Sequence, residues 1–195
     1  MPRTIEFYYD FGSPASYIAH CRLKGVAVRT GALVELIPIL LGAVFKATGN
    51  ASPIECPAKG RYVAVDLMRF AARDGLPFAM NPHFPINTTV VMRLAAALRD
   101  DPRYARYVDF AFDAMWHFPR NMGEPDEVVA MLTNAGFDAA ATLALAGTQP
   151  VKDALRATTD AAIERGVFGA PTFFVDGAMW FGQDRLDWVE AAVAD

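Results

Sequence analysis

The sequence predicts an α/β fold in which strands lie at the two ends of the chain and a long helical block lies between them. Two strand-like segments bracket a helical segment near the N-terminus: 4–9, which is rich in β-branched and aromatic residues, and 32–37, which precedes Pro38. The stretch from about 40 to 165 has almost no strand signal. Two further apolar segments, 172–175 and 178–181, flank a short turn. The chain therefore predicts a βαβ unit, a helical block and a ββα unit.

The first helix carries clear boundary signals. After the first strand the chain turns at Asp10-Phe11-Gly12. Ser13 is a good N-cap, and Pro14 suits the first helical position, where a missing N–H costs nothing. We expect this helix to run to about Lys24 and to end at Gly25. A strand–helix–strand unit of this length indicates a parallel crossover.

The middle of the chain predicts a helical subdomain. A stripe at helical spacing follows a candidate N-cap, and these residues are Asn87, Val90, Val91, Leu94 and Leu98. Other helices are expected to end at Asp74-Gly75, to contain Tyr104 to Met115, and to begin at Pro125, Asp138 and Pro150.

The last two strands are joined by Asp176-Gly177, a strong hairpin signal. A final amphipathic helix carries Leu186, Val189 and Val193. We expect the two ends of the chain, which are far apart in sequence, to complete one sheet.

Composition excludes several classes of protein. The length of 195 residues fits one domain, or one domain with a large insertion. Hydrophobic residues make up 53%, too many for a disordered chain, and the net charge of −4 argues against a grip on nucleic-acid phosphates. No apolar run approaches the ~20 residues of a membrane span, and we expect no secretory signal, since no basic segment followed by an apolar stretch is seen near residue 1. A cytoplasmic location is therefore expected.

The segment Ser13-Pro14-Ala15-Ser16 lies at a helix N-terminus, which favours an anion such as a thiolate. In this layout thioredoxin-like proteins carry Cys-x-x-Cys here, and serine occupies both cysteine places. Disulfide exchange through this motif is therefore excluded. Ser13 could donate a hydrogen bond to the thiolate of another molecule, or serve only as an N-cap.

Two other segments suggest ligand contacts. In Gly169-Ala170-Pro171-Thr172 the proline opens a strand, and a cis bond would turn the preceding backbone outward to pair with a peptide. In Gly182-Gln183-Asp184-Arg185, Asp184 is either the N-cap of the last helix or a carboxylate that pairs with a ligand ammonium group.

Together these segments resemble the glutathione-binding branch of the thioredoxin fold, and in particular the 2-hydroxychromene-2-carboxylate isomerases and the kappa-class glutathione transferases. The resemblance covers essentially the whole chain, in the expected order. The stretches that carry it are 7–17, 48–50, 57–62, 81–88, 166–175 and 181–186. It implies a DsbA-like thioredoxin domain formed by 1–39 and 150–195, with an inserted helical subdomain at 40–149.

The resemblance also implies a glutathione site. Ser13 would hold the thiol, and Asn50 and Lys59 would contact the tripeptide, with Lys59 facing the glycine carboxylate. Ala170, before a cis Pro171, would pair with the cysteinyl backbone.

Gln183 and Asp184 would hold the γ-glutamyl end, although Gln183 departs from the serine or asparagine expected there. Lowering a thiol pKa of ~8.5 by ~2 units takes ~2.7 kcal/mol. One charge-assisted hydrogen bond, at ~1.5–3 kcal/mol, and a helix N-terminus, at ~0.3–1 kcal/mol, can supply that energy without a metal.

The implied activity is isomerisation of 2-hydroxychromene-2-carboxylate to trans-o-hydroxybenzylidenepyruvate, with glutathione as cofactor. The thiolate adds to a conjugated carbon, the former double bond rotates, and the thiolate leaves. The alternatives are a kappa-like transferase or peroxidase, and a non-catalytic thiol-peptide binder. The family also implies a homodimer. Candidate contacts to an aromatic substrate are Phe11, Tyr17, His83, Phe84, Asn87 and Trp116, although aromatic residues at helical spacing are usually core.

The remaining reactive side chains carry weaker signals. His20, two helical turns after Ser13, is too far along the helix for a nucleophile pair and is expected to be structural or on the surface. Cys21 suits a small core residue, and Cys56 an exposed thiol without a resolving partner. Three scattered histidines make a poor metal site, and His117 has no evident partner.

Overall fold

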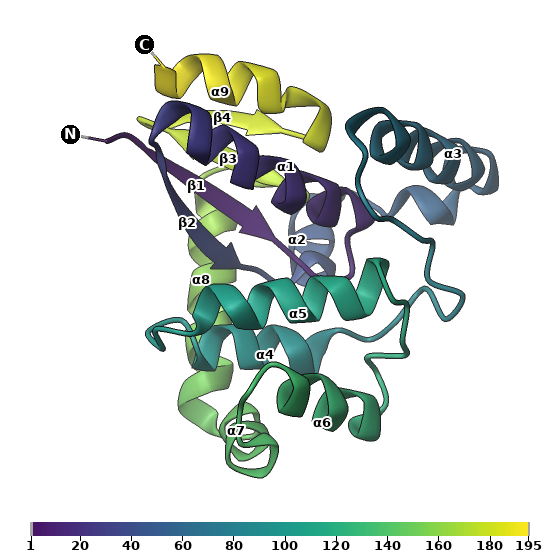
Figure 1. Ribbon diagram of the computed structural model, residues 1–195, viewed down its shortest axis with the longest axis vertical. Helices are drawn as coiled ribbons and strands as arrows, with labels where there is room; N and C mark the ends of the chain where they lie inside the picture. The colour runs from purple at the N-terminus through teal and green to yellow at the C-terminus, as the bar shows by residue number, and fades with distance from the viewer. Residues whose placement is uncertain (1, 195) are drawn as a thin grey trace.

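The structure is a computed structural model that describes residues 2–194. The strands occupy the two ends of the chain, as predicted, and helices fill the middle (Figure 1). In chain order the elements are β1 (Thr4–Tyr9), α1 (Pro14–Thr30), β2 (Leu33–Pro38), α2 (Leu41–Thr48), the 3₁₀ turn η1 (Pro53–Glu55), α3 (Pro57–Asp74), α4 (Thr89–Ala97), α5 (Tyr104–Trp116), α6 (Pro125–Asn134), α7 (Ala139–Ala146), α8 (Gln149–Glu164), β3 (Thr172–Val175), β4 (Ala178–Phe181), the 3₁₀ turn η2 (Gln183–Arg185) and α9 (Leu186–Ala194).

The strands form one sheet in the order β2-β1-β3-β4. β1 and β2 are parallel, and Phe7 lies opposite Leu36. β3 is antiparallel to both β1 and β4. Phe7 of β1 therefore has Leu36 of β2 on one side and Phe173 of β3 on the other. The two ends of the chain therefore complete one sheet, as the sequence predicts, and the parallel crossover is confirmed.

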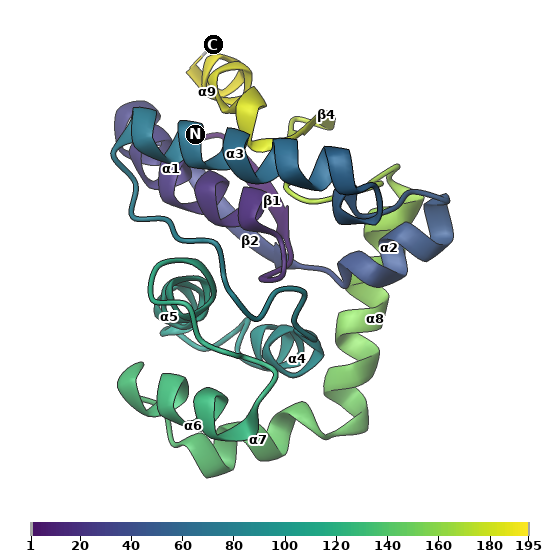
Figure 2. The same ribbon diagram turned by 90° about the vertical axis from the view of Figure 1, so that its right-hand side faces the viewer.

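Helices cover both faces of this sheet. α1 and α9 lie side by side on one face, while α2 and α8 pack together on the other (Figures 1 and 2). Successive side chains of β1 point to opposite faces of the sheet and so contribute to the cores on both faces. Ile5, Phe7 and Tyr9 join the larger core, and Tyr8 joins a smaller one with Phe174.

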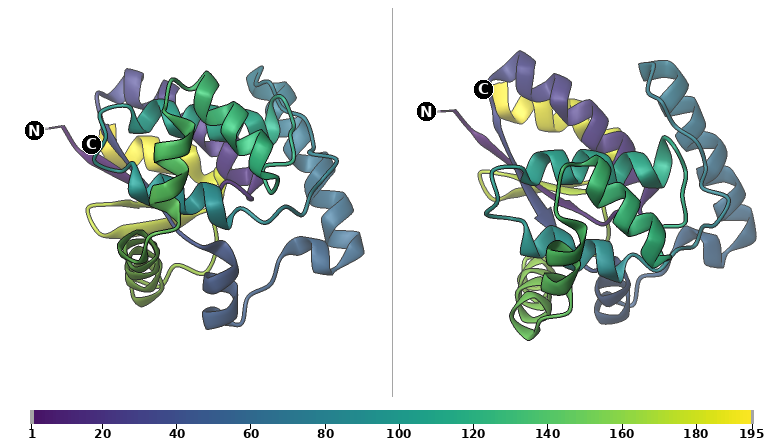
Figure 3. Two further views of the ribbon diagram at one scale, coloured as in Figure 1. Left: turned by 90° about the horizontal axis from the view of Figure 1, so that it is seen from below. Right: turned by 60° about the horizontal axis from the view of Figure 1, so that its bottom comes forward.

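Helices from the middle of the chain share the larger core with the sheet. The Phe112 ring of α5 lies 5.4 Å from Tyr9 and 4.8 Å from Phe11, measured between ring centroids. Figure 1 shows α4 to α7 gathered on one side of the strands, and Figure 3 shows α3 (blue) standing apart from them. The contacts of the Phe112 ring fix the residues at the end of β1 and just after it against the helical block.

The first helix is longer than predicted. It does not end at Gly25 but continues to Thr30, and Gly31, with φ of 70°, is its C-cap. The reason is burial: Val26 is 2% exposed, so the extra turns add apolar area to the core. Glycine tolerates a helix interior at a cost of about 1 kcal/mol, which such burial offsets.

Two predicted caps also differ. Thr88 precedes α4, while the Asn87 side chain accepts a hydrogen bond from the backbone N–H of Thr89 at 3.0 Å. Asp184 is not the N-cap of the last helix, because it lies inside η2 and pairs with Arg185 at 2.6 Å.

Other boundaries are confirmed. Gly75 ends α3 with φ of 63°, and Asp138 caps α7 through the N–H of Ala141 at 3.0 Å. Asp176 and Gly177 have φ of 49° and 83°, the left-handed conformations of a tight hairpin. Among the described residues, no helix is both long and apolar enough to cross a membrane.

Candidate active site

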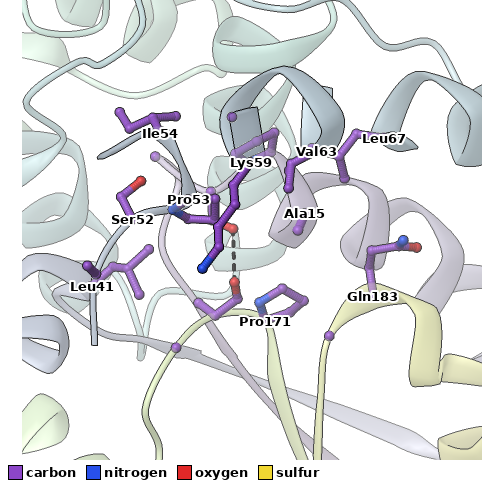
Figure 4. A pocket seen from close by; sticks show the side chains of 18 of the residues that line it. Ala15, Leu41, Ser52, Pro53, Ile54, Lys59, Val63, Leu67, Pro171 and Gln183 are labelled. Atoms are coloured by element: carbon purple, nitrogen blue, oxygen red, sulfur yellow. Dashed lines mark hydrogen bonds between the residues drawn. The ribbon is translucent and has the colours of Figure 1, made fainter. Parts of the chain in front are cut away.

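A cavity of about 910 Å³ opens at the N-terminus of α1. The connection from α2 to α3, the first turns of α3, the loop before β3 and the turn after β4 form its other walls (Figure 4). Every residue for which the family resemblance implies thiol or tripeptide binding lines this one cavity: Ser13, Asn50, Lys59, Ala170, Pro171, Gln183 and Asp184.

Ser13 is the N-cap of α1. Its Oγ accepts a hydrogen bond from the N–H of Ser16 and donates one to the carbonyl of Ala170, both at 3.1 Å. The capping role is therefore confirmed. A hydroxyl has one hydrogen, so in this state Ser13 donates to Ala170 and to no other group. The first turn of α1 contains no acidic residue that would weaken the attraction of the helix N-terminus for an anion.

The turn before Ser13 is anchored by Asp10, a residue that the sequence did not single out. Its buried carboxylate accepts hydrogen bonds from the N–H of Gly12 at 2.8 Å, the N–H of Leu41 at 2.9 Å and the hydroxyl of Thr88 at 2.9 Å. Burial raises the pKa of Asp10, and these three donors oppose the rise. The carboxylate thereby joins the α1, α2 and α4 segments beneath the cavity.

The loop before β3 faces Ser13 across the cavity. The Ala170–Pro171 bond is cis, as the sequence suggested. The Pro171 carbonyl accepts a hydrogen bond from the N–H of Gly182 at 3.0 Å, which ties this loop to the turn after β4.

Asn50 and Lys59 lie on the α2–α3 side. The Asn50 amide donates to the carbonyl of Phe168 at 2.8 Å and accepts from the N–H of Ala51 at 2.8 Å, so it fastens one wall to the other. The Lys59 side chain extends from the first turn of α3 toward Pro171 (Figure 4). A cation therefore projects into the cavity from this side.

Gln183 and Asp184 lie at the opposite side. Gln183 is 5% exposed and Asp184 is half-exposed. The carboxylate of Asp184 forms an ion pair with the guanidinium of Arg185. The two sides of the cavity thus carry opposite charges, with lysine at one and aspartate at the other.

The predicted substrate residues fall into two groups. Phe84 lines the cavity, beside the apolar residues Val63, Leu67, Phe70 and Met80. The others do not line it: Phe11, Tyr17 and Trp116 are core residues at most 1% exposed, His83 lines a separate shallow hollow, and Asn87 is exposed. Trp116 Nε1 donates to the carbonyl of Phe11 at 2.8 Å. This bond holds the indole inside the core, so Trp116 does not face the cavity.

The weaker candidates are placed apart from the cavity, with one exception. His20 is buried and lies 2.6 Å from the carboxylate of Asp109, and Cys21 is half-buried, with its pKa raised by burial. Cys56 is exposed and lines the cavity. His117 lies 3.7 Å from Asp113. Residues 2–194 contain no group of three or more His, Cys, Asp or Glu placed to hold a metal ion.

The chain is similar along its whole length to proteins of one fold family. Residues 4–194 match the family model of the DSBA-like thioredoxin domain. The 2-hydroxychromene-2-carboxylate isomerase of Sphingobium xenophagum is 32% identical over 100% of both chains, and that of Pseudomonas putida is 33% identical over 97% of this chain and 93% of its own. Human glutathione S-transferase kappa 1 is 30% identical over 96% of this chain and 88% of its own.

A solved structure of a 2-hydroxychromene-2-carboxylate isomerase agrees in three dimensions. It is 31% identical, with a TM-score of 0.89, and the match covers 97% of this chain and 93% of that one. The sheet, its helical layers and the serine at the α1 N-terminus define a thioredoxin-fold protein without the cysteine pair. The chain belongs to the DsbA-like thioredoxin family, in the branch that holds the 2-hydroxychromene-2-carboxylate isomerases and the kappa-class glutathione transferases.

Proposed function

We propose that this protein is a glutathione-dependent isomerase that converts 2-hydroxychromene-2-carboxylate to trans-o-hydroxybenzylidenepyruvate, in the breakdown of aromatic compounds. One observation carries the proposal. A chain about one-third identical to the isomerases places all seven implied thiol- and tripeptide-binding residues around one cavity.

The residues present fit glutathione. The tripeptide has two carboxylates and one ammonium group, and Lys59 and Asp184 offer opposite charges at opposite sides of the cavity. A volume of about 910 Å³ lies in the upper part of the range for small-molecule sites, about 300–1,000 Å³, and leaves room for a second molecule. The apolar residues near Phe84 would contact that molecule, an aromatic acid.

The hydrogen bond between Ser13 and Ala170 gives the site a specific way to respond to a peptide. A ligand backbone N–H that donates to the Ala170 carbonyl would take over the role of the Ser13 hydroxyl. The hydroxyl could then turn and donate to a thiolate, while its oxygen still accepts from Ser16. Binding of the peptide backbone at the Ala170 carbonyl would therefore free the Ser13 hydroxyl to stabilise the thiolate.

When bound, glutathione would supply a thiolate for reversible addition to the conjugated system of the ring-opened substrate. Ser13 and the α1 N-terminus would lower the pKa of that thiol, and Asp10 would hold the turn that carries Ser13. Lys59 and Asp184 would orient the tripeptide through its charged ends.

The test is turnover of 2-hydroxychromene-2-carboxylate with and without glutathione. We expect isomerisation that requires the thiol and is lost with S-methylglutathione. Glutathione-independent turnover would overturn the mechanism. Conjugation of glutathione to an aryl halide without isomerisation would favour the kappa-class alternative, which the relative at 30% identity supports.

A further inference from the structure

Arg22 is a largely buried arginine of α1 that does not line the cavity. Its side chain is 14% exposed and is held by two carboxylates. Nε lies 3.0 Å from Asp74 at the end of α3, and Nη2 donates to Asp187 at the start of α9 at 2.9 Å. The guanidinium is therefore fixed by groups from two other elements.

The remaining nitrogen of this guanidinium contacts Gln183. Nη1 donates to the Gln183 backbone carbonyl at 2.7 Å and lies 3.4 Å from its side-chain oxygen Oε1. Arginine has donors and no acceptor, so only the amide oxygen can face it. The amide NH₂ must then point away from Arg22. Figure 4 shows Gln183 in the cavity wall beside Leu67 and across from Leu41.

We propose that Arg22 is a positioning residue that fixes the Gln183 carboxamide with its NH₂ toward the cavity, so that this side selects a ligand carrying a carboxylate. The inference rests on the proposed function, in which the γ-glutamyl end of glutathione, with its α-carboxylate, lies there. Without Arg22 the amide can turn over and present its oxygen, which repels a carboxylate.

Arginine suits this role better than lysine. The planar fork contacts Asp74, Asp187 and the two oxygens of Gln183 from one rigid group. An ammonium group at the end of a flexible chain has three donors and no fixed plane, so Arg22→Lys should restore the function only in part.

The experiment measures the affinity of two thiol-free probes by calorimetry. One is S-methylglutathione, and the other is its γ-aminobutyryl analogue, which lacks only the α-carboxylate. We expect the wild type to prefer the first by tenfold or more, the effect of a hydrogen bond to a charged group. Arg22→Met should weaken binding of S-methylglutathione and leave binding of the analogue little changed. The ratio of the two dissociation constants should therefore approach one.

Gln183→Glu provides the complementary variant. The new carboxylate still accepts from Arg22, so the fold is retained, but it has no N–H to offer the ligand. It should abolish the preference for the α-carboxylate.

Arg29→Met is the matched control for structure. Arg29 also joins α1 to α9, through a paired contact with Glu190 in which Nη2 lies 2.7 Å from the carboxylate, and it does not line the cavity. This variant should keep the full preference, with thermal unfolding followed for all variants.

Two results would overturn the inference while leaving the proposed function in place. One is a wild type that binds both probes equally, and the other is a preference that survives Arg22→Met or falls equally in Arg29→Met. A wild type that binds neither probe would overturn the proposed function itself, and the inference with it.

Discussion

Replacing Ser13 by alanine should have two separable effects, one on folding and one on the bound thiol. In the structure the Ser13 hydroxyl caps α1 through the N–H of Ser16 and donates to the carbonyl of Ala170. Removing an N-cap side chain costs about 0.5–2 kcal/mol, typically about 1. The orphaned carbonyl adds about 0.5–1.5 kcal/mol. We expect the free energy of unfolding to fall by roughly 1–3 kcal/mol.

The second effect concerns chemistry. A charge-assisted hydrogen bond to a thiolate contributes about 1.5–3 kcal/mol, and 1.36 kcal/mol corresponds to one pKa unit. In Ser13→Ala the pKa of the bound glutathione thiol should therefore rise by about 1–2 units toward its free value. The assay follows thiolate ultraviolet absorbance against pH at saturating glutathione, alongside denaturant unfolding of the same samples.

Ser16→Ala is the matched control. Within residues 2–194, Ser16 Oγ is a buried atom with no hydrogen-bond partner. Its removal should leave stability unchanged or slightly raised, because no bond is lost and a buried polar atom disappears. If Ser13→Ala destabilises the protein while the pKa of the bound thiol stays the same, Ser13 is only a helix cap and the proposed chemistry fails.

Three further predictions concern the cavity and the sheet. Cys56, exposed in the cavity wall, should react with iodoacetamide faster than half-buried Cys21 and be protected by S-methylglutathione; equal protection of both would contradict the location of the site. Lys59→Met should weaken glutathione binding several-fold, with a difference from wild type that shrinks as salt is added, whereas a salt-independent difference would argue against charge pairing. The pKa of Glu6 is lowered from 4.5, chiefly by its hydrogen bond with the arginine that follows α8. That stabilisation is present above the unfolded pKa and is lost as the pH falls through the lower folded pKa. Glu6→Gln should therefore cost about 1 kcal/mol or less in unfolding free energy near neutral pH and almost nothing near pH 3, and an equal cost at both pH values would refute the assignment.

Local patterns predicted the elements well where the signal is itself local. The hairpin at Asp176-Gly177 depends on the left-handed conformations of these two residues, and the end of α3 depends on Gly75. The predicted end of α1 was wrong, because where this helix ends depends on packing against residues that are distant in sequence. Val26 continues the helix by packing into the core, which outweighs the stop signal of Gly25.

The candidate site divides in the same way. The family resemblance implied seven residues that line the cavity, because it rests on short ordered runs of sequence. It did not identify which aromatic residues face the cavity. Trp116 and Phe84 are both large aromatic residues, but Trp116 is fully buried and Phe84 lines the cavity wall. The sequence placed Asp10 in a turn but did not identify its anchoring role, because two of its three hydrogen bonds come from Leu41 and Thr88, which are distant in sequence.

The sequence by itself thus determined the strand and helix order, the serine in place of the cysteine pair, and the residues that resemble a glutathione site. The tertiary structure alone decided how they meet. The Ser13 hydroxyl donates to Ala170, and Arg22 turns the amide of Gln183. Such contacts join segments that are far apart along the chain, and the direction of a hydrogen bond is set only when both partners have been placed.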